Sequence, residues 1–326
     1  LKNKETINPE TLPNLTRKRN ERKFHMTQAR QIVECVPNFS EGRDKEKIER
    51  IVAPLKGRQG VRLVNYEGDA DYNRLVVTVL GEPTAVKEAV LDTIGVATEL
   101  IDLNVHEGEH SRMGATDVVP FIPIRNMTME EAVELSKETA KAIYERYDIP
   151  VFLYENSATS PDRVNLARIR KGQFEGMKEK IMQPEWGPDY GERKIHPTAG
   201  VTAVCARFPL VAYNIDLDTD NIDIANKIAR AIRQSGGGFQ HIKAGGVELK
   251  EKGIVQVTMN ITDYRKNPIY RVFETVKMEA ARYGVSVIGS EIVGLAPMAA
   301  LTESLEYYIG LHDFSEEKII EHWLLG

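Results

Sequence analysis

The chain has 326 residues, of which 42% are hydrophobic and 28% charged, enough for two domains with buried cores. Its net charge is −5, with 43 basic and 48 acidic residues interspersed, which argues against a nucleic-acid partner. No apolar run reaches the roughly 18 residues of a membrane span, and no secretory signal precedes Met26. The composition therefore predicts a cytoplasmic protein with no membrane contact.

Two features of the chain concern its ends and its thiols. Residues 1–25 are polar, and we expect them to form a mobile N-terminal extension with Met26 as the natural start. Cys35 and Cys205 lie in apolar, strand-like runs, so we expect buried thiols rather than a disulfide or a nucleophile.

Strands and helices alternate in the first half of the chain. Residues 31–40 predict a buried strand, 43–57 a helix, 61–66 and 73–81 two strands, 83–102 an amphipathic helix, and 128–147 and 151–155 a further helix and strand. Between the second and third helices, VVPFIPI at 118–124 carries two prolines and predicts an edge or bulged strand. This order is a split β-α-β arrangement with an extra helix and strand.

A polar segment rich in Gly and Pro, residues 156–196, then predicts an irregular linker. Beyond it we expect a hairpin at 200–217, a helix at 220–234, two strands within 247–261, a helix at 268–283, a strand at 285–293 and two short helices. The predicted fold class is therefore α+β, with two halves joined by the irregular linker.

The pentapeptide HEGEH at 106–110 matches the zinc-protease pattern HExxH. That chemistry needs both histidines on one helical turn, and Gly108 in the middle costs a helix about 1 kcal/mol relative to Ala. No apolar stripe continues beyond His110, and no third ligand follows at a recognised spacing. The segment therefore predicts a loop and no metal.

The sequence around His110 favours chemistry in that loop. HSRMGATD places an imidazole, a guanidinium and a carboxylate between a helix and a strand, with little that a core would need. His110 suits proton transfer, whereas His106 is either functional or a solvated loop residue. Arg112 either binds a substrate carboxylate or forms a salt bridge with Asp117.

Other polar residues near the strand ends have two interpretations each. Asp69, Asp71 or Asn73 either orients the His110 ring or has an ordinary turn role. Asn38, or Ser40 beside it, either caps the following helix or contacts a ligand.

Several motifs together resemble the formiminotransferase family. They are ECVPNFSEG at 34–42, HEGEHSRMGATDVVPFIP at 106–123 and EWGPDYG followed by HPTAGVTAV within 185–204, with DYNR at 71–74 and SEIVGLAP at 290–297 in support. The similarity runs in order from about residue 31 to the end of the chain, and the first two motifs are highly specific. Ser111 departs from the pattern, since many members have Pro there, so the loop is predicted to be less stiff.

The resemblance implies glutamate formimidoyltransferase activity in histidine degradation. The formimidoyl group would move between N-formimidoyl-L-glutamate and tetrahydrofolate, giving 5-formimidoyltetrahydrofolate and L-glutamate. It implies two ferredoxin-like α/β-sandwich subdomains, at 26–183 and 184–326. It also implies a monofunctional homodimer in which His110 matches the catalytic histidine and folate lies between the two subdomains. The matching folate-binding segment consists of Gly191, Glu192, Arg193, Lys194, Ile195, His196, Pro197, Thr198, Ala199 and Gly200.

Formimidoyl transfer exchanges one amine for another at an amidinium carbon, so His110 would serve as base and then as acid. Arg112, Arg74, Arg193 and Lys194 are candidates to pair with substrate carboxylates, although Arg193 and Lys194 are as readily explained as solvated surface residues. Two alternatives remain: transfer to or from glycine, which needs only a different acceptor pocket, and a zinc hydrolase built on HEGEH.

Overall fold

The computed structural model describes residues 30–324 and contains two separate hydrophobic cores, each built by one half of the chain. Both halves combine a sheet with helices, which confirms the predicted α+β class. The extension predicted at residues 1–25 lies outside the described residues.

The first subdomain is built on a seven-stranded mixed sheet. Its strands are β1 (Ile32–Cys35), β2 (Asn38–Phe39), β3 (Val61–Asp69), β4 (Arg74–Gly81), β5 (Thr116–Arg125), β6 (Val151–Glu155) and β7 (Thr202–Ala206). β1 and β2 are one strand interrupted at Val36 and Pro37, and both lie between β4 and β5. The spatial order is therefore β3, β4, β1 with β2, β5, β7 and β6, whose first four positions follow the ferredoxin-like order.

The hairpin predicted at 200–217 does not form, because its first strand, β7, belongs to the first sheet. β7 pairs in parallel with β5 and β6 in the first sheet, and not with the next strand of the chain. All five of its residues are buried, as in a parallel strand that is covered on both faces. We therefore place the boundary between the subdomains after Ala206, whereas the sequence placed it at residues 183 and 184.

β5 was predicted to be an edge or bulged strand, and it is a bulged strand inside the sheet, since it lies between β1 with β2 and β7. The predicted bulge does occur, because Ile32 and Val33 face Arg125 and Pro123, which leaves Ile124 unpaired. A proline cannot donate to a sheet ladder, and the irregular pairing beside Pro123 accommodates it inside the sheet.

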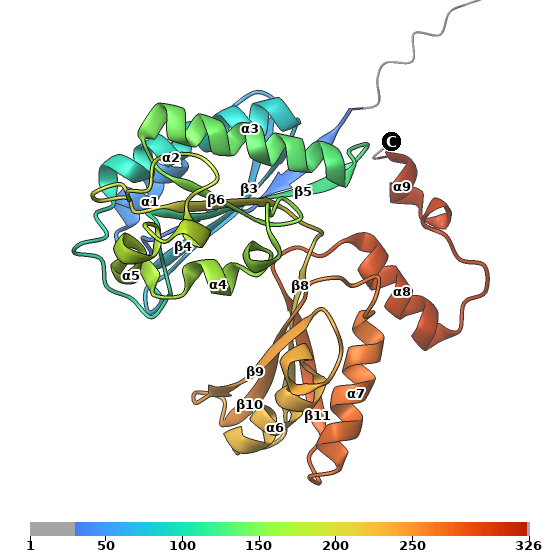
Figure 1. Ribbon diagram of the computed structural model, residues 1–326. Coiled ribbons are helices and arrows are strands. Elements are labelled where there is room, and N and C mark those ends of the chain that lie inside the picture. The colour runs from blue at the N-terminus through green and yellow to red at the C-terminus, as the bar shows by residue number, and fades with distance from the viewer. Residues whose placement is uncertain (1–29, 325–326) are drawn as a thin grey trace, which may run out of the picture. The chain divides into compact units, whose positions relative to one another are not determined.

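Helices cover both faces of the first sheet (Figure 1). On one face lie α1 (Lys45–Val52), which continues into η1 (Ala53–Leu55), α2 (Pro83–Leu100) and α3 (Met129–Tyr147). Thr128 and Glu131 begin α3 with a capping box. The other face is covered by the linker, which folds into η2 (Pro161–Arg163), α4 (Leu166–Arg170), α5 (Gln173–Lys180) and η3 (Pro184–Trp186).

The second subdomain has the plain ferredoxin-like arrangement. Its strands are β8 (Val211–Leu217), β9 (Ile242–Leu249), β10 (Ile254–Ile261) and β11 (Val287–Val293), all antiparallel in the order β11, β8, β10, β9. α6 (Ile222–Ile232) and α7 (Ile269–Ala281) pack on them, and α8 (Met298–Ile309) and α9 (Ile320–Leu324) follow; η4 (Gln234–Gly236) and η5 (Glu316–Lys318) are single turns. β8 alternates buried and half-buried residues, as expected for a strand with one face in the core.

Both cysteines are fully buried and unpaired, as predicted. Burial raises the pKa of Cys205 to about 12, so its thiol is a poor nucleophile at neutral pH. Within residues 30–324, no helix combines the length and the apolar character that crossing a bilayer requires.

Candidate functional site

The HEGEH segment lies in an irregular loop, residues 101–115, that connects α2 to β5. The prediction of a loop is therefore confirmed. Gly108 is required by a close approach, because a Cβ atom there would lie 2.5 Å from the carbonyl oxygen of Tyr72 and 2.6 Å from Cβ of Asn73. The loop packs tightly on the turn between β3 and β4, and backbone bonds from Glu109 to Asp71 and from His110 to Tyr72 hold it there.

Asn73 connects three segments at this turn. Its backbone is left-handed, with φ of 48°, and its side chain is buried. Oδ1 accepts the N–H of Gly42 at 2.8 Å, and Nδ2 donates to the carbonyl of Glu107 at 2.8 Å. Asn73 therefore fixes the ECVPNFSEG and HEGEH motifs against each other, a positioning role that goes beyond an ordinary turn.

Both ring nitrogens of His106 are used within the protein. Nε2 lies 3.0 Å from the carbonyl oxygen of Asn73, and Nδ1 accepts Nε–H of Arg112 at 3.3 Å. Burial lowers the pKa of His106, and the Arg112 cation lowers it further, although the bond to Asn73 opposes both. A guanidinium at Nδ1 and a carbonyl at Nε2 leave no nitrogen for a metal, which argues against the zinc interpretation of HEGEH.

Arg112 is nearly buried and forms a fork-shaped pair with Glu175 of α5. Its Nη1 and Nη2 donate to Oε2 at 2.9 Å and Oε1 at 2.7 Å. The salt bridge with Asp117 considered from the sequence does not form. Arg112 instead fastens the linker to the HEGEH loop, and most of its donors are already used.

His110 is mostly buried beside the carboxylate of Asp117. Its Nε2 lies 3.5 Å from Oδ2 of Asp117, whose side chain is about 1% exposed. The same oxygen accepts a 2.6 Å bond from Nη2 of Arg170, in α4. Burial opposes ionisation of Asp117, but His110, Arg170 and the Met113 N–H together lower the pKa of Asp117 below its usual value.

The predicted folate segment ends directly beside the histidine loop. The Ala115 N–H donates to the Ala199 carbonyl at 2.9 Å, and the Val201 N–H donates to the Met113 carbonyl at 3.0 Å. A Cβ atom on Gly200 would lie 2.3 Å from the Met113 oxygen, and φ of Gly200 is 69°. Two motifs that are about eighty residues apart in the sequence therefore form one site.

Within the folate segment, most side chains away from this junction are exposed. Glu192, Arg193 and Lys194 are exposed, while Ile195 and Ala199 are buried. His196 closes a local turn, since its Nδ1 accepts the N–H of Ala199 at 2.9 Å. Burial lowers the pKa of His196.

The remaining candidates lie around the same turns. Asp69 accepts the N–H groups of Asp71 and Tyr72, which is a turn role, and Arg74 lies over the Tyr72 ring at 5.5 Å. Of the two interpretations of Asn38 and Ser40, the helix cap does not form, because Asp44 caps α1.

Those two residues have other partners, since Asn38 donates to the Val36 carbonyl and Ser40 to the Gly114 carbonyl. Ser40 thereby supports the loop that carries His110.

A pocket of about 220 Å³ opens beside His106. Its lining combines cationic and anionic side chains and consists of Ser40, Glu41, Arg43, Lys47, Asn73, Ile101, Asp102, Val105, His106 and Glu107. Sequence reasoning missed Arg43 and Lys47, although Arg43 directly follows ECVPNFSEG. It also missed Arg170 and Glu175, for which the polar linker gave no distinguishing pattern.

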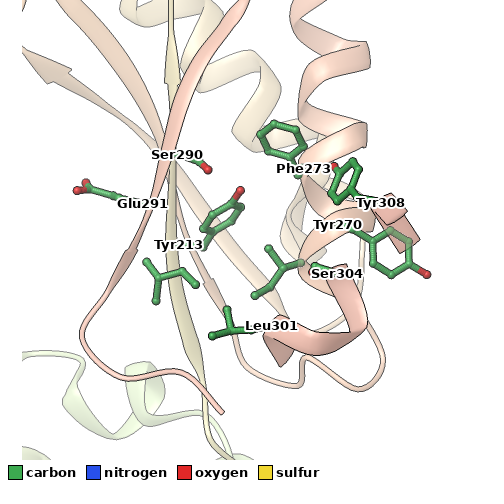
Figure 2. A pocket seen from close by; sticks show the side chains of 10 residues that line it. Tyr213, Tyr270, Phe273, Ser290, Glu291, Leu301, Ser304 and Tyr308 are labelled. Carbon is green, nitrogen blue, oxygen red and sulfur yellow. The ribbon is translucent and has the colours of Figure 1, made fainter. Parts of the chain in front are cut away.

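A larger pocket of about 440 Å³ lies within the second subdomain and has a different character (Figure 2). Aromatic and aliphatic side chains of β8, β11, α7 and α8 surround it, including Tyr213, Phe273, Leu301 and Tyr308. No candidate site residue lines it. Size alone therefore does not locate the chemistry of this protein.

The protein has two ferredoxin-like subdomains. The first has additional elements and carries a buried histidine–carboxylate–arginine cluster, and the second has no such additions. It is therefore a two-subdomain α+β protein whose site lies in a loop. The profile described as "Formiminotransferase domain, N-terminal subdomain" matches residues 32–207, and the profile "Formiminotransferase domain" matches 212–322. The chain therefore belongs to the formiminotransferase family.

Two curated relatives are similar over nearly their full length, and a third over about half of its length. Glutamate formimidoyltransferase of Streptococcus pyogenes serotype M1 is 56% identical over 90% of this chain and 99% of its own length. The protein of the same name from Thermoplasma acidophilum is 44% identical over 89% of this chain and 96% of its own. Formimidoyltransferase-cyclodeaminase of Dictyostelium discoideum is 40% identical over 85% of this chain and 53% of its own length.

Proposed function

We propose that this protein is a transferase that moves the formimidoyl group between N-formimidoyl-L-glutamate and tetrahydrofolate, giving 5-formimidoyltetrahydrofolate and L-glutamate. Two relatives called glutamate formimidoyltransferase, at 56% and 44% identity, support glutamate over glycine as the amino acid. The observation that carries the proposal is the junction of the histidine loop with the segment at 191–200.

His110 is the general base and acid of the transfer. Each transfer attaches one amine to the amidinium carbon and expels another, so protons must leave and reach nitrogen in turn. The His110 side chain is about 10% exposed, which leaves one edge of the ring accessible while water is largely excluded. The segment of residues 191–200 beside it contacts the folate and holds its N5 near the ring.

The 220 Å³ pocket holds the glutamyl partner. N-formimidoyl-L-glutamate carries an amidinium cation and two carboxylates, and the pocket presents two bases, Arg43 and Lys47, among three acids. Within residues 30–324, the Arg43 guanidinium makes a single hydrogen bond, from Nε to the Ala70 carbonyl at 2.7 Å. Its remaining donors suit a carboxylate.

Replacing His110 tests the catalytic assignment. His110→Gln should reduce kcat by about 10²–10⁴, the usual range for loss of general acid–base catalysis, and should leave binding of 5-formyltetrahydrofolate intact. His312→Gln, at an exposed histidine after α8, is the matched control and should be silent. A wild-type rate for His110→Gln would refute the role of this residue.

A second variant tests the glutamyl pocket. Arg43→Gln should raise KM for N-formimidoyl-L-glutamate and leave KM for tetrahydrofolate unchanged, because only the amino acid would contact Arg43. The opposite selectivity would assign the pocket to folate.

We also propose that the enzyme acts in histidine degradation, in the cytoplasm and as a homodimer. Light scattering of the purified protein tests the dimer directly, and a mass of one chain would exclude it.

A further inference from the structure

Asp117 lies at a β-bulge, where the register between β2 and β5 shifts. Asn38 faces Val118 and Phe39 faces Thr116, so Asp117 between them has no partner across the ladder. The bulge lets its carboxylate bond outside the ladder, where Oδ1 accepts the Met113 N–H at 2.8 Å and Oδ2 accepts Nη2 of Arg170 at 2.6 Å. These two bonds fix the carboxylate while it is fully buried.

Nε2 of His110 faces this fixed carboxylate. The atom is buried, has no hydrogen-bond partner within residues 30–324, and lies 3.5 Å from Oδ2 of Asp117. A lone pair on Nε2 would point at a negative oxygen and be repelled, whereas an N–H there would be attracted. Nε2 therefore favours a proton in both charge states of the ring.

From this geometry, and resting on the proposed function, we infer that Nδ1 of His110 is the nitrogen that accepts and returns the substrate proton. Asp117 is then a positioning residue that keeps Nε2 protonated, and Arg170 is a second one that holds Asp117 in place. His106 provides the contrast, since Arg112 and Asn73 occupy its two ring nitrogens. Nδ1 of His110 makes no hydrogen bond to residues 30–324.

Nitrogen-15 NMR of histidine-labelled wild-type protein tests the inference without any variant at the site. His110→Gln assigns the His110 signals by their disappearance. At a pH where the ring is neutral, we expect shifts of the tautomer protonated on Nε2 and unprotonated on Nδ1. The reverse tautomer would overturn the inference, even if His110→Gln has lost activity and the proposed function stands.

Variants of the supporting residues give a second readout. Asp117→Asn should lower kcat by about 10²–10⁴, leave KM for tetrahydrofolate unchanged and populate the other tautomer. Arg170→Gln should act in the same direction, and Arg170→Lys should restore most of the rate because it keeps a cation beside Asp117.

The matched control is Arg168→Gln, because Arg168 lies in the same helix as Arg170. This change removes an exposed pair with Asp162 and should leave kcat and the tautomer unchanged. If Asp117→Asn fails to fold, the two variants Arg170→Gln and Arg170→Lys provide the test. A wild-type tautomer and rate in Arg170→Gln would show that Arg170 does not position Asp117 for the reaction.

Discussion

The two subdomains share one strand order but differ in the connection between the second helix and the last strand of the motif. In the first subdomain this connection is the long loop 101–115, which carries HEGEH; in the second it is the short turn 282–286. The first subdomain also gains α3, β6, β7 and the linker, which supplies Arg170 and Glu175. The site of the first subdomain therefore depends on additions to a scaffold that both subdomains share.

Two ion pairs of the first subdomain are more deeply buried than the pairs observed in the second subdomain. Arg163–Asp189 and Arg170–Asp117 in the first subdomain have side chains at most 20% exposed. The bases of the pairs observed in the second subdomain, Arg265, Lys277 and Arg282, are 49%, 58% and 65% exposed. Buried pairs fix geometry at the risk of a large penalty when one partner is lost.

The largest expected effect follows from that difference. Arg163→Met should lower the free energy of unfolding by about 3–5 kcal/mol, because the Asp189 carboxylate would stay buried without its cation. Arg282→Met in the second subdomain removes an exposed pair and should cost no more than about 1 kcal/mol. Urea unfolding of both variants measures the contrast, and equal losses would mean that burial of the pair does not matter.

The next effect concerns the long loop. Gly108→Ala places a methyl group against the Tyr72 carbonyl and Asn73, so the loop must move away and carry His110 with it. A displacement of about 1 Å can cost about 10²-fold in rate, and we expect kcat to fall by that order. Gly245→Ala in β9 meets open space and is the control. Steady-state kinetics decides, and an unaffected kcat would show that the loop does not need this packing.

The sequence predicts the second subdomain better than the additions to the first. The second subdomain follows the periodicity of its residues closely, since β8 alternates and α6 and α7 are amphipathic. The histidine loop was also predictable, because Gly108 and the missing apolar stripe argue against a helix.

The additions to the first subdomain were harder to predict. β7 has no alternation, so periodicity could not assign its partners, and a bulge accommodates Pro123 of β5 inside the sheet. Arg170 and Glu175 lie in a linker whose residues carry no spacing signal, and only the folded chain brings them to Asp117 and Arg112.

A smaller effect is expected at the aromatic pocket of the second subdomain. Tyr308→Phe removes a 2.8 Å bond to Glu274 at a half-exposed position, which should change stability by at most about 1 kcal/mol. Because no candidate site residue lines this pocket, kcat and both KM values should be unchanged. A raised KM for tetrahydrofolate would extend the folate site into the second subdomain and weaken the contrast.

The smallest effect is a pH dependence that belongs to the first subdomain. Burial, assisted by Arg112, lowers the pKa of His106 below the 6.5 of an ordinary histidine. A lowered pKa in the folded state means that the contribution of His106 to stability is complete above about pH 6.5 and is lost as the pH falls through the folded-state value. Protonation of Nδ1 would also break its bond from Arg112.

Wild-type protein should therefore lose more stability than His106→Gln between about pH 7.5 and about pH 5.5. His312→Gln, at an exposed position, should follow the wild type in urea unfolding at both pH values. Parallel losses in all three proteins would mean that His106 is protonated equally in the folded and unfolded chains, and that the long loop does not depend on its neutral ring.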